Sequence, residues 1–120
     1  MIKDIAFTAY PAKDVKALRA FYTDALGLNF TAAFEQEGAL MYDEAKVGNG
    51  FFAIATTQWM EDHPGQGIAF EVDDIEKTAG DLRSRNIEIG EIHDTPVCRI
   101  GSFTDPEGNQ VTLHQTTVPH

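Results

Sequence analysis

Two segments of the chain have apolar residues at helical spacing. The first follows Asp14, a good N-cap, and stops at Gly27, which suits the left-handed position after a helix. The second follows Asp73 or Asp74 and ends near Asn86. Both are expected to be amphipathic helices, with inward-facing residues Val15, Leu18, Phe21, Tyr22, Ala25 and Leu26 in the first and Ile75, Ala79 and Leu82 in the second.

The residues around each helix favour strands, because runs of β-branched and aromatic residues are separated by turn residues. A strand is expected before the first helix, at residues 2–10, and it should stop at Pro11. The other expected strands are residues 29–34, 39–42 and 51–57 after the first helix, and 67–72, 87–93, 97–103 and 110–116 around the second. Residues 43–50 are expected to be a loop.

An internal repeat links the two halves of the chain. Residues 105–115 predict a turn followed by a strand, and residues 45–55 occupy the same frame sixty positions earlier, with Gly48 and Asn49 matching Gly108 and Asn109. The chain is therefore expected to be one domain made of two copies of one unit. Their bounds are about 1–57 and 67–120, joined by a connection at 58–66.

The order of elements predicts the fold class. Each unit has one helix to cover one face of a four-stranded sheet, and the other face needs a different cover. We expect an α+β fold of two tandem βαβββ units, with curled mixed sheets enclosing a cavity and the helices outside. A chain of 120 residues can bury such a core without disulfides or a structural metal.

Charge and composition narrow the possible partners. The net charge of -10 argues against nucleic acid or an anionic membrane surface, because both carry the same sign of charge. It fits an acidic surface that keeps the protein soluble, and it also fits a cationic ligand. The chain has one cysteine, Cys98, no apolar signal stretch and no apolar run of about 18 residues. A cytoplasmic protein is expected, and it is expected to be a homodimer because sheet edges are readily completed by a second chain.

Three motifs in order resemble the vicinal oxygen chelate superfamily of glyoxalases, bleomycin-resistance proteins and extradiol dioxygenases. They are residues 14–28, residues 68–74 and the Asp-Pro-Glu-Gly-Asn sequence at 105–109. The resemblance covers nearly the whole chain and supports the two βαβββ units. One fold of this kind carries many chemistries, so it is a weaker guide to function.

The resemblance also implies where a metal would lie. Metal-dependent relatives commonly use His and Glu on the first and last strands of each unit, and motif spacing maps these positions to Phe7, Phe52, Gly67 and Thr112. Only the threonine hydroxyl offers an oxygen, which is a poor set of donors for a divalent ion. An alignment shifted by one residue, to Phe51 or Ala53, serves no better. We therefore expect no metal and no cofactor.

Strand parity indicates what the cavity would hold instead, because residues two apart share a face. The expected ligand-binding residues are Phe7, Phe52, Ile54, Glu71, Thr112 and His114, with Trp59 as a roof from the connection. Glu71 and His114 are expected to act as separate polar ends of an elongated cavity. Phe70, Val72, Val111 and Leu113 are expected to pack under the helices.

The polar residues of this set have alternative roles. His114 could be a polar anchor or general base, or a histidine at a strand end bonded to a carbonyl. Glu71 could meet a cationic ligand or Arg99, or could lie at the wet mouth of the cavity. Trp59 could stack on a flat ligand or cover a boundary between units or chains.

Two functional hypotheses follow. The first is a metal-free protein of the glyoxalase/bleomycin-resistance kind that binds a small organic molecule in an apolar cavity. The alternative is a lyase or isomerase-like enzyme of the glyoxalase group that uses His114 and Glu71, or a displaced divalent metal. The sequence assigns no catalytic residue.

Overall fold

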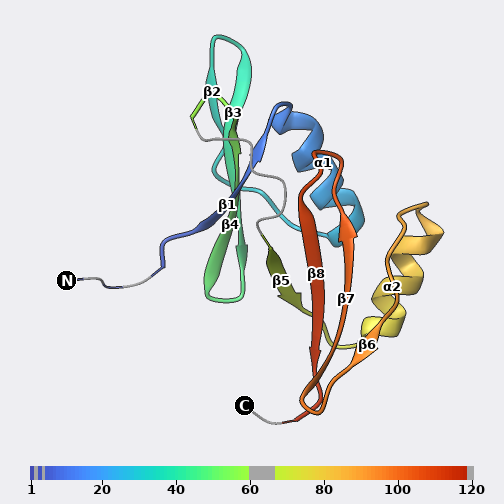
Figure 1. The fold of residues 1–120 in the computed structure, drawn as a ribbon. Coiled ribbons are helices and arrows are strands. Elements are labelled where there is room, and N and C mark those ends of the chain that lie inside the picture. The colour runs from blue at the N-terminus through green and yellow to red at the C-terminus, as the bar shows by residue number, and fades with distance from the viewer. Residues whose placement is uncertain (2, 4, 60–66, 119–120) are drawn as a thin grey trace. The chain divides into compact units, whose positions relative to one another are not determined.

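The computed structural model describes residues 1, 3, 5–59 and 67–118. The chain divides into two compact units, Met1–His63 and Pro64–His120. Each unit consists of a strand, a helix and three further strands in that order (Figure 1). The α+β class and the two tandem βαβββ units predicted from the sequence are confirmed.

Unit 1 holds a four-stranded mixed sheet. Its elements are β1 (Thr8–Ala12), α1 (Val15–Leu26), β2 (Phe34–Gln36), β3 (Ala39–Val47) and β4 (Gly50–Thr56). The strand order is β1-β4-β3-β2, in which β1 runs parallel to β4 and the other pairs are antiparallel. Helix α1 packs against β3 and β4.

Unit 2 repeats this topology. Its elements are β5 (Ile68–Glu71), α2 (Ile75–Ser84), β6 (His93–Asp94), β7 (Cys98–Thr104) and β8 (Gln110–Thr116). The order β5-β8-β7-β6 places β5 parallel to β8, and Figure 1 shows β7 and β8 as the long hairpin of this sheet. Helix α2 packs against β7 and β8.

Both helices begin where the sequence predicts. The Asp14 carboxylate accepts a hydrogen bond from Ala17 N at 3.0 Å, and the Asp74 carboxylate accepts one from Lys77 N at 3.1 Å. Helix α1 ends at Gly27, whose φ of 70° is left-handed and easily adopted by glycine. The fully buried side chains of the helices, which anchor them to their sheets, are Leu18, Tyr22, Ile75, Ala79 and Leu82.

Strands β1 and β3 differ from the sequence expectation. Strand β1 begins at Thr8, later than the expected residue 2, and it continues through Pro11, which is tolerated because β1 is an outer strand of the sheet. Strand β3 runs through residues 43–47, which were expected to be loop. The loop was expected because of the Gly-Asn-Gly at 48–50, but Asp43 lies within the strand, where its carboxylate is buried and bonded to Arg19 at 3.0 Å and to Ala32 N at 2.8 Å.

The first strand after each helix, β2 or β6, begins later and is shorter than expected. Residues 29–34 contribute a bridge from Phe30 to Ala45 and the first residue of β2, and residues 87–93 contribute a bridge from Ile89 to Phe103 and the first residue of β6. Strand β8, by contrast, has the predicted bounds. It follows a turn in which Asp105 Oδ1 accepts hydrogen bonds from Glu107 N and Asn109 N at 2.9 Å.

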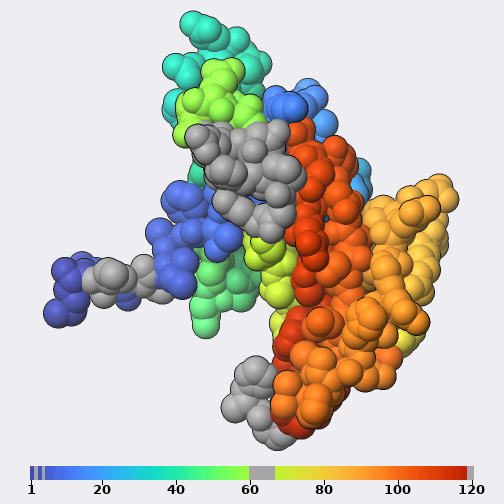
Figure 2. Space-filling model, in the orientation of Figure 1, coloured from blue at the N-terminus to red at the C-terminus, as the bar shows by residue number. Residues whose placement is uncertain are grey.

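The first residues of the chain, dark blue in Figure 2, extend away from the body of unit 1, but Phe7, directly before β1, contacts Tyr42. Ile5 in this segment is 78% exposed. Within the described residues, no helix is both long and apolar enough to cross a membrane.

Candidate ligand site

The pairing of β1 with β4 decides which side chains share a face in unit 1. Thr8 pairs with Phe52 and Ala9 with Ala53, so Ala9 lies on the face of Ala53 and Ala55, while Phe52 lies on the opposite face with Tyr10. The Phe52 ring contacts the rings of Tyr10 and Tyr22 at centroid distances of 5.5 and 4.8 Å. Because Tyr22 belongs to α1, Phe52 is part of the core under the helix.

The expectation that Phe52 and Ile54 line a cavity is therefore wrong. Both lie on the helix-facing side of β4, and their side chains are 3% and 0% exposed. The strand is shifted by one position relative to the motif-based alignment. Phe51, Ala53 and Ala55 are the residues that share the face of Ala9.

An aromatic groove lies on the face opposite α1. It has a volume of about 600 Å³ and is lined by residues of all four strands and of the segments before β1 and after β4: Phe7, Ala9, Phe34, Tyr42, Ala55 and Trp59. Phe7 and Trp59 were expected at a ligand site, and the structure brings them together here. Ala9 and Ala55 form a smooth floor because their side chains are small.

The rings of the groove contact one another without closing it. Trp59 stacks on Tyr42 with 6.5 Å between centroids and 29° between planes, and it contacts Phe34 at 5.7 Å. Phe7 meets Tyr42 edge to face at 6.0 Å. Phe7, Phe34 and Trp59 nevertheless remain 49%, 49% and 51% exposed, so the groove presents aromatic surface to its surroundings.

Tyr42 provides the polar group of the groove. Its hydroxyl donates a hydrogen bond to Glu44 Oε1 at 2.6 Å. Partial burial, together with the hydrogen bond to the Glu44 carboxylate and its negative charge, raises the pKa of Tyr42 well above its usual value of 10.0. The phenol is therefore neutral at physiological pH.

Unit 2 carries a carboxylate–imidazole pair on its sheet. The register pairs Glu71 with His114, and Glu71 Oε1 lies 2.6 Å from His114 Nδ1. Glu71 Oε2 also accepts a hydrogen bond from Thr116 N at 2.8 Å. The Thr116 amide, followed by the His114 imidazole, lowers the pKa of Glu71 below its usual value of 4.5.

This geometry changes two expectations for the pair. Glu71 and His114 were expected at separate ends of a cavity, but adjacent parallel strands bring them into direct contact. Arg99 does not meet Glu71, because it bonds to Glu76 at 2.9 Å and to Asp94 at 2.6 Å. Those two carboxylates raise the pKa of Arg99, with the hydrogen bond to Asp94 as the larger cause.

Thr112 lies on the same face of β8 as His114, two residues away. Its hydroxyl and that of Ser102 are 3.0 Å apart across β7 and β8. Val111 and Leu113 point to the other face and are fully buried, as the alternation predicts.

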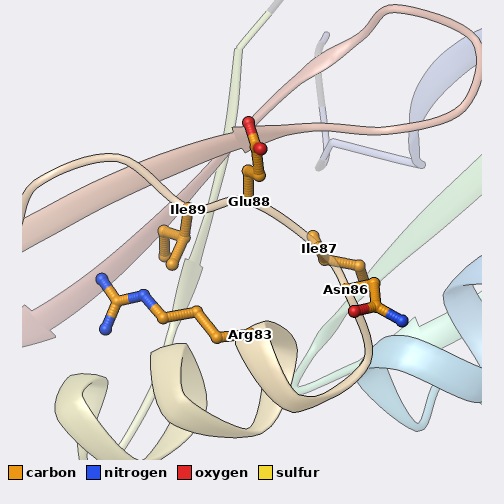
Figure 3. A pocket seen from close by; sticks show the side chains of 5 residues that line it. All are labelled: Arg83, Asn86, Ile87, Glu88 and Ile89. Atoms are coloured by element: carbon orange, nitrogen blue, oxygen red, sulfur yellow. The ribbon is translucent and has the colours of Figure 1, made fainter.

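A second hollow, of about 530 Å³, lies at the C-terminal end of α2. Figure 3 shows Arg83 reaching toward Ile89 while the Glu88 carboxylate points away from it. The remaining lining residues are Asn86 and Ile87. The hollow thus brings no charged pair together, and the aromatic groove is the better candidate for a ligand.

The residues present do not fit the divalent metal site of metal-dependent relatives. Shifting the β4 position to Phe51 still supplies no donor, and Phe7, Gly67 and Thr112 add only a hydroxyl. Glu71 and His114 contribute one carboxylate and one imidazole. Among residues 1, 3, 5–59 and 67–118, no group of three or more His, Cys, Asp or Glu could hold a metal ion.

Comparison with known families agrees with the topology. Residues 4–113 match the model of the Glyoxalase/Bleomycin resistance protein/Dioxygenase superfamily. The chain belongs to this superfamily. A search of curated proteins finds no significant sequence match.

Solved structures of superfamily type share the fold at low sequence identity. The antibiotic-binding protein TnmS3 from Streptomyces sp. CB03234 is 19% identical, with a TM-score of 0.80 over 97% of this chain and 98% of that one. A lactoylglutathione lyase from Agrobacterium tumefaciens is 22% identical, with a TM-score of 0.78 over 96% and 95%. The oxidase ChaP-H2 is 22% identical, with a TM-score of 0.77 over 100% and 97%. At these identities the likeness establishes the fold alone.

Sequence reasoning missed Phe34, Tyr42 and Ala55 as groove residues. Phe34 and Tyr42 were assigned to two strands joined by a hairpin connection, but the register was not assigned, and the pairing of Phe34 with Tyr42 is what places both rings together. Ala55 was missed through the one-residue shift on β4. The pairing of β1 with β4 reveals the face of Ala55, and the pairings of β3 with β4 and of β2 with β3 extend that face to Tyr42 and Phe34. No local signal specifies a parallel register between distant strands such as β1 and β4.

Proposed function

We propose that this superfamily member binds a small, flat organic molecule in the aromatic groove of unit 1, without the help of a metal. The observation that carries the proposal is the set of Phe7, Phe34, Tyr42 and Trp59 around one hollow. The antibiotic-binding protein with the same fold is consistent with this type of activity.

The exposure of the rings supplies the driving force. Three aromatic side chains that are about half exposed leave apolar surface in water, and a ligand that covers them gains about 25 cal/mol for each Å² removed from solvent. The volume of about 600 Å³ lies in the usual range for sites of small organic molecules. Rings of this kind favour flat ligands, because stacking maximises the contact area.

Titration calorimetry with naphthylmethanol, a neutral flat probe, tests the proposal. Trp59→Ala and Phe34→Ala should each weaken binding by about tenfold, which corresponds to an uncovered area of roughly 50 Å² at 25 cal/mol per Å². Trp59 is the single tryptophan of the chain, so its fluorescence provides a second readout of the groove.

Phe51→Ala is the matched control. Phe51 is 37% exposed on the same sheet but does not line the groove. Its removal should leave the affinity unchanged. Equal losses for Phe51→Ala and Phe34→Ala, or no binding to the wild-type protein, would contradict the proposal.

A second candidate function is an acid–base activity at Glu71 and His114. The 2.6 Å contact supports it, since a carboxylate at Nδ1 orients an imidazole so that Nε2 can take or give a proton. Nε2 has no hydrogen-bond partner among the described residues, and the His114 side chain is 28% exposed. This arrangement supports a lyase or isomerase-like reaction that moves protons.

The fold shared with a lactoylglutathione lyase suggests the first substrate to test. Conversion of lactoylglutathione should be abolished by His114→Gln and reduced by Glu71→Gln, while Trp59→Ala should leave it unchanged if the pair works alone. Elemental analysis of the same dialysed sample shows whether a displaced divalent metal takes part. Turnover that survives His114→Gln would eliminate this candidate.

A further inference from the structure

The groove of unit 1 has one polar edge, at the Tyr42 hydroxyl. A phenol carries a single donor proton, and Tyr42 gives it to Glu44 Oε1 at 2.6 Å. The oxygen then has only lone pairs to offer. A molecule in the groove can therefore bond to Tyr42 as a donor but not as an acceptor.

This arrangement persists at physiological pH. Burial and the Glu44 carboxylate raise the pKa of Tyr42, so the phenol keeps the proton that points at Glu44. A ligand that carries an acceptor cannot reverse the bond, because the competing acceptor is a full carboxylate. Charge-assisted bonds of this kind are about twice as strong as neutral ones.

In the part of the chain that the structure describes, no cationic side chain forms an ion pair with Glu44. Lys46 lies two residues further along the same face of β3, but among the described residues it forms no ion pair with Glu44. The neighbouring Asp43 differs, because its carboxylate faces Arg19 at 3.0 Å. Glu44 therefore leaves uncompensated negative charge at the edge of an apolar groove.

The aromatic rings are a third feature that favours a positively charged ligand. Aromatic faces carry partial negative charge and attract ammonium and guanidinium groups within about 6 Å of the ring centre. Trp59, Tyr42 and Phe7 provide such rings around the hollow. The hydroxyl lone pairs, the carboxylate and the ring faces thus all favour a cationic N–H donor.

We propose that the groove selects flat aromatic molecules that carry an ammonium or similar cationic N–H group, and that Tyr42 and Glu44 set this selectivity. The inference rests on the proposed function, since it names the class of ligand for the same groove. It assigns Glu44 a role in specificity although that residue does not line the hollow itself.

Three probes with one ring system test the inference: naphthylmethylammonium, naphthylmethanol and naphthoate. Calorimetry on the wild-type protein should give the tightest binding for the ammonium, with an affinity about tenfold above the alcohol, and the weakest for the carboxylate. All three probes offer the same apolar area, so the differences report the polar edge.

Two variants locate the effect. Glu44→Gln keeps the size of the side chain and an acceptor for Tyr42, and it should reduce the preference for ammonium over alcohol by about tenfold without weakening the alcohol. Tyr42→Phe should weaken both probes. Glu88→Gln removes one surface charge from unit 2 and controls for the net charge of -10, so it should change neither affinity.

The outcomes separate this inference from the proposed function. Equal affinity for all three probes would overturn the selectivity while leaving the groove as a ligand site. Absence of binding by all three would overturn both. An equal loss of preference in Glu44→Gln and Glu88→Gln would show that overall charge, and not the edge of the groove, decides. Circular dichroism of each variant confirms that it is folded.

Discussion

At the scale of single residues, Glu71 illustrates how two hydrogen bonds turn a surface carboxylate into a pH-dependent contact. Its partners are the imidazole of His114 and the backbone amide of Thr116. Both favour the ionised form, so the pKa in the folded protein lies below the usual value of 4.5. Linkage requires that such a group stabilises the fold at pH values above its unfolded pKa.

The first prediction follows from this sign. Glu71→Gln should lower the free energy of unfolding at pH 7, and the difference from wild type should shrink as the pH falls below about 4.5, because the carboxylate becomes protonated in the wild type as well. Urea unfolding of both proteins at several pH values measures this difference in the free energy of unfolding. A difference that is independent of pH, or as large in Glu88→Gln, would contradict the prediction.

Asp43, in contrast to Glu71, is a buried carboxylate, and both of its oxygens accept hydrogen bonds. It is 1% exposed, bonds to Arg19 and accepts from Ala32 N and Glu44 N, both at 2.8 Å. The second prediction is that Asp43→Ala lowers the free energy of unfolding by about 2–4 kcal/mol, because Arg19 and two amides lose their partner. A loss below about 0.5 kcal/mol in urea unfolding would show that these bonds are replaced by water.

At the scale of elements, strand β4 separates the core from the groove by alternation. Phe52 packs under α1, while its neighbour Phe51 faces the other way. The third prediction is that Phe52→Ala costs about 3–5 kcal/mol of stability, whereas Phe51→Ala costs less than about 1. Thermal or urea unfolding compares the two. Similar losses would mean that the register of β1 and β4 is wrong.

The turn before β8 depends on a backbone shape that suits glycine. Gly108 has a φ of 88°, and a Cβ there would meet nothing within 4 Å, so any penalty comes from the backbone alone. The fourth prediction is that Gly108→Ala destabilises the protein by about 1–2 kcal/mol. Gly80→Ala, in the exposed part of α2 and equally free of contacts, should instead stabilise it by about 0.5–1 kcal/mol. Unfolding midpoints that move in the same direction for both would contradict this account.

At the scale of the whole molecule, the net charge and the sheet edges have opposite effects on the association of two chains. The outermost strands are β1 and β2 in one sheet and β5 and β6 in the other, and such edges favour association. A net charge of -10 on each chain opposes it. The fifth prediction is a homodimer, with a sedimentation mass of twice 13.2 kDa at tens of micromolar, that becomes tighter as salt screens the repulsion. A monomer at every salt concentration would contradict it.

The amino-acid sequence by itself determined the order of elements, both helix caps and the bounds of β8. These features depend on neighbours in the chain: a carboxylate bonds to an amide three residues on, and a glycine adopts a left-handed turn. Strand parity in unit 2 was also accessible, because alternation assigns Val111 and Leu113 to the core and Thr112 and His114 to the other face.

Only the tertiary structure decided the faces of β4, the groove and the polar pairs. The position of Phe52 depends on its parallel register with β1, across more than forty residues, and a shift of one residue reverses every side chain. Arg19 meets the buried Asp43 only because α1 packs against β3, and Glu71 meets His114 only because β5 and β8 are neighbours. Tertiary pairing is set by the packing of distant segments, so local patterns can identify the strands but not the partners they choose.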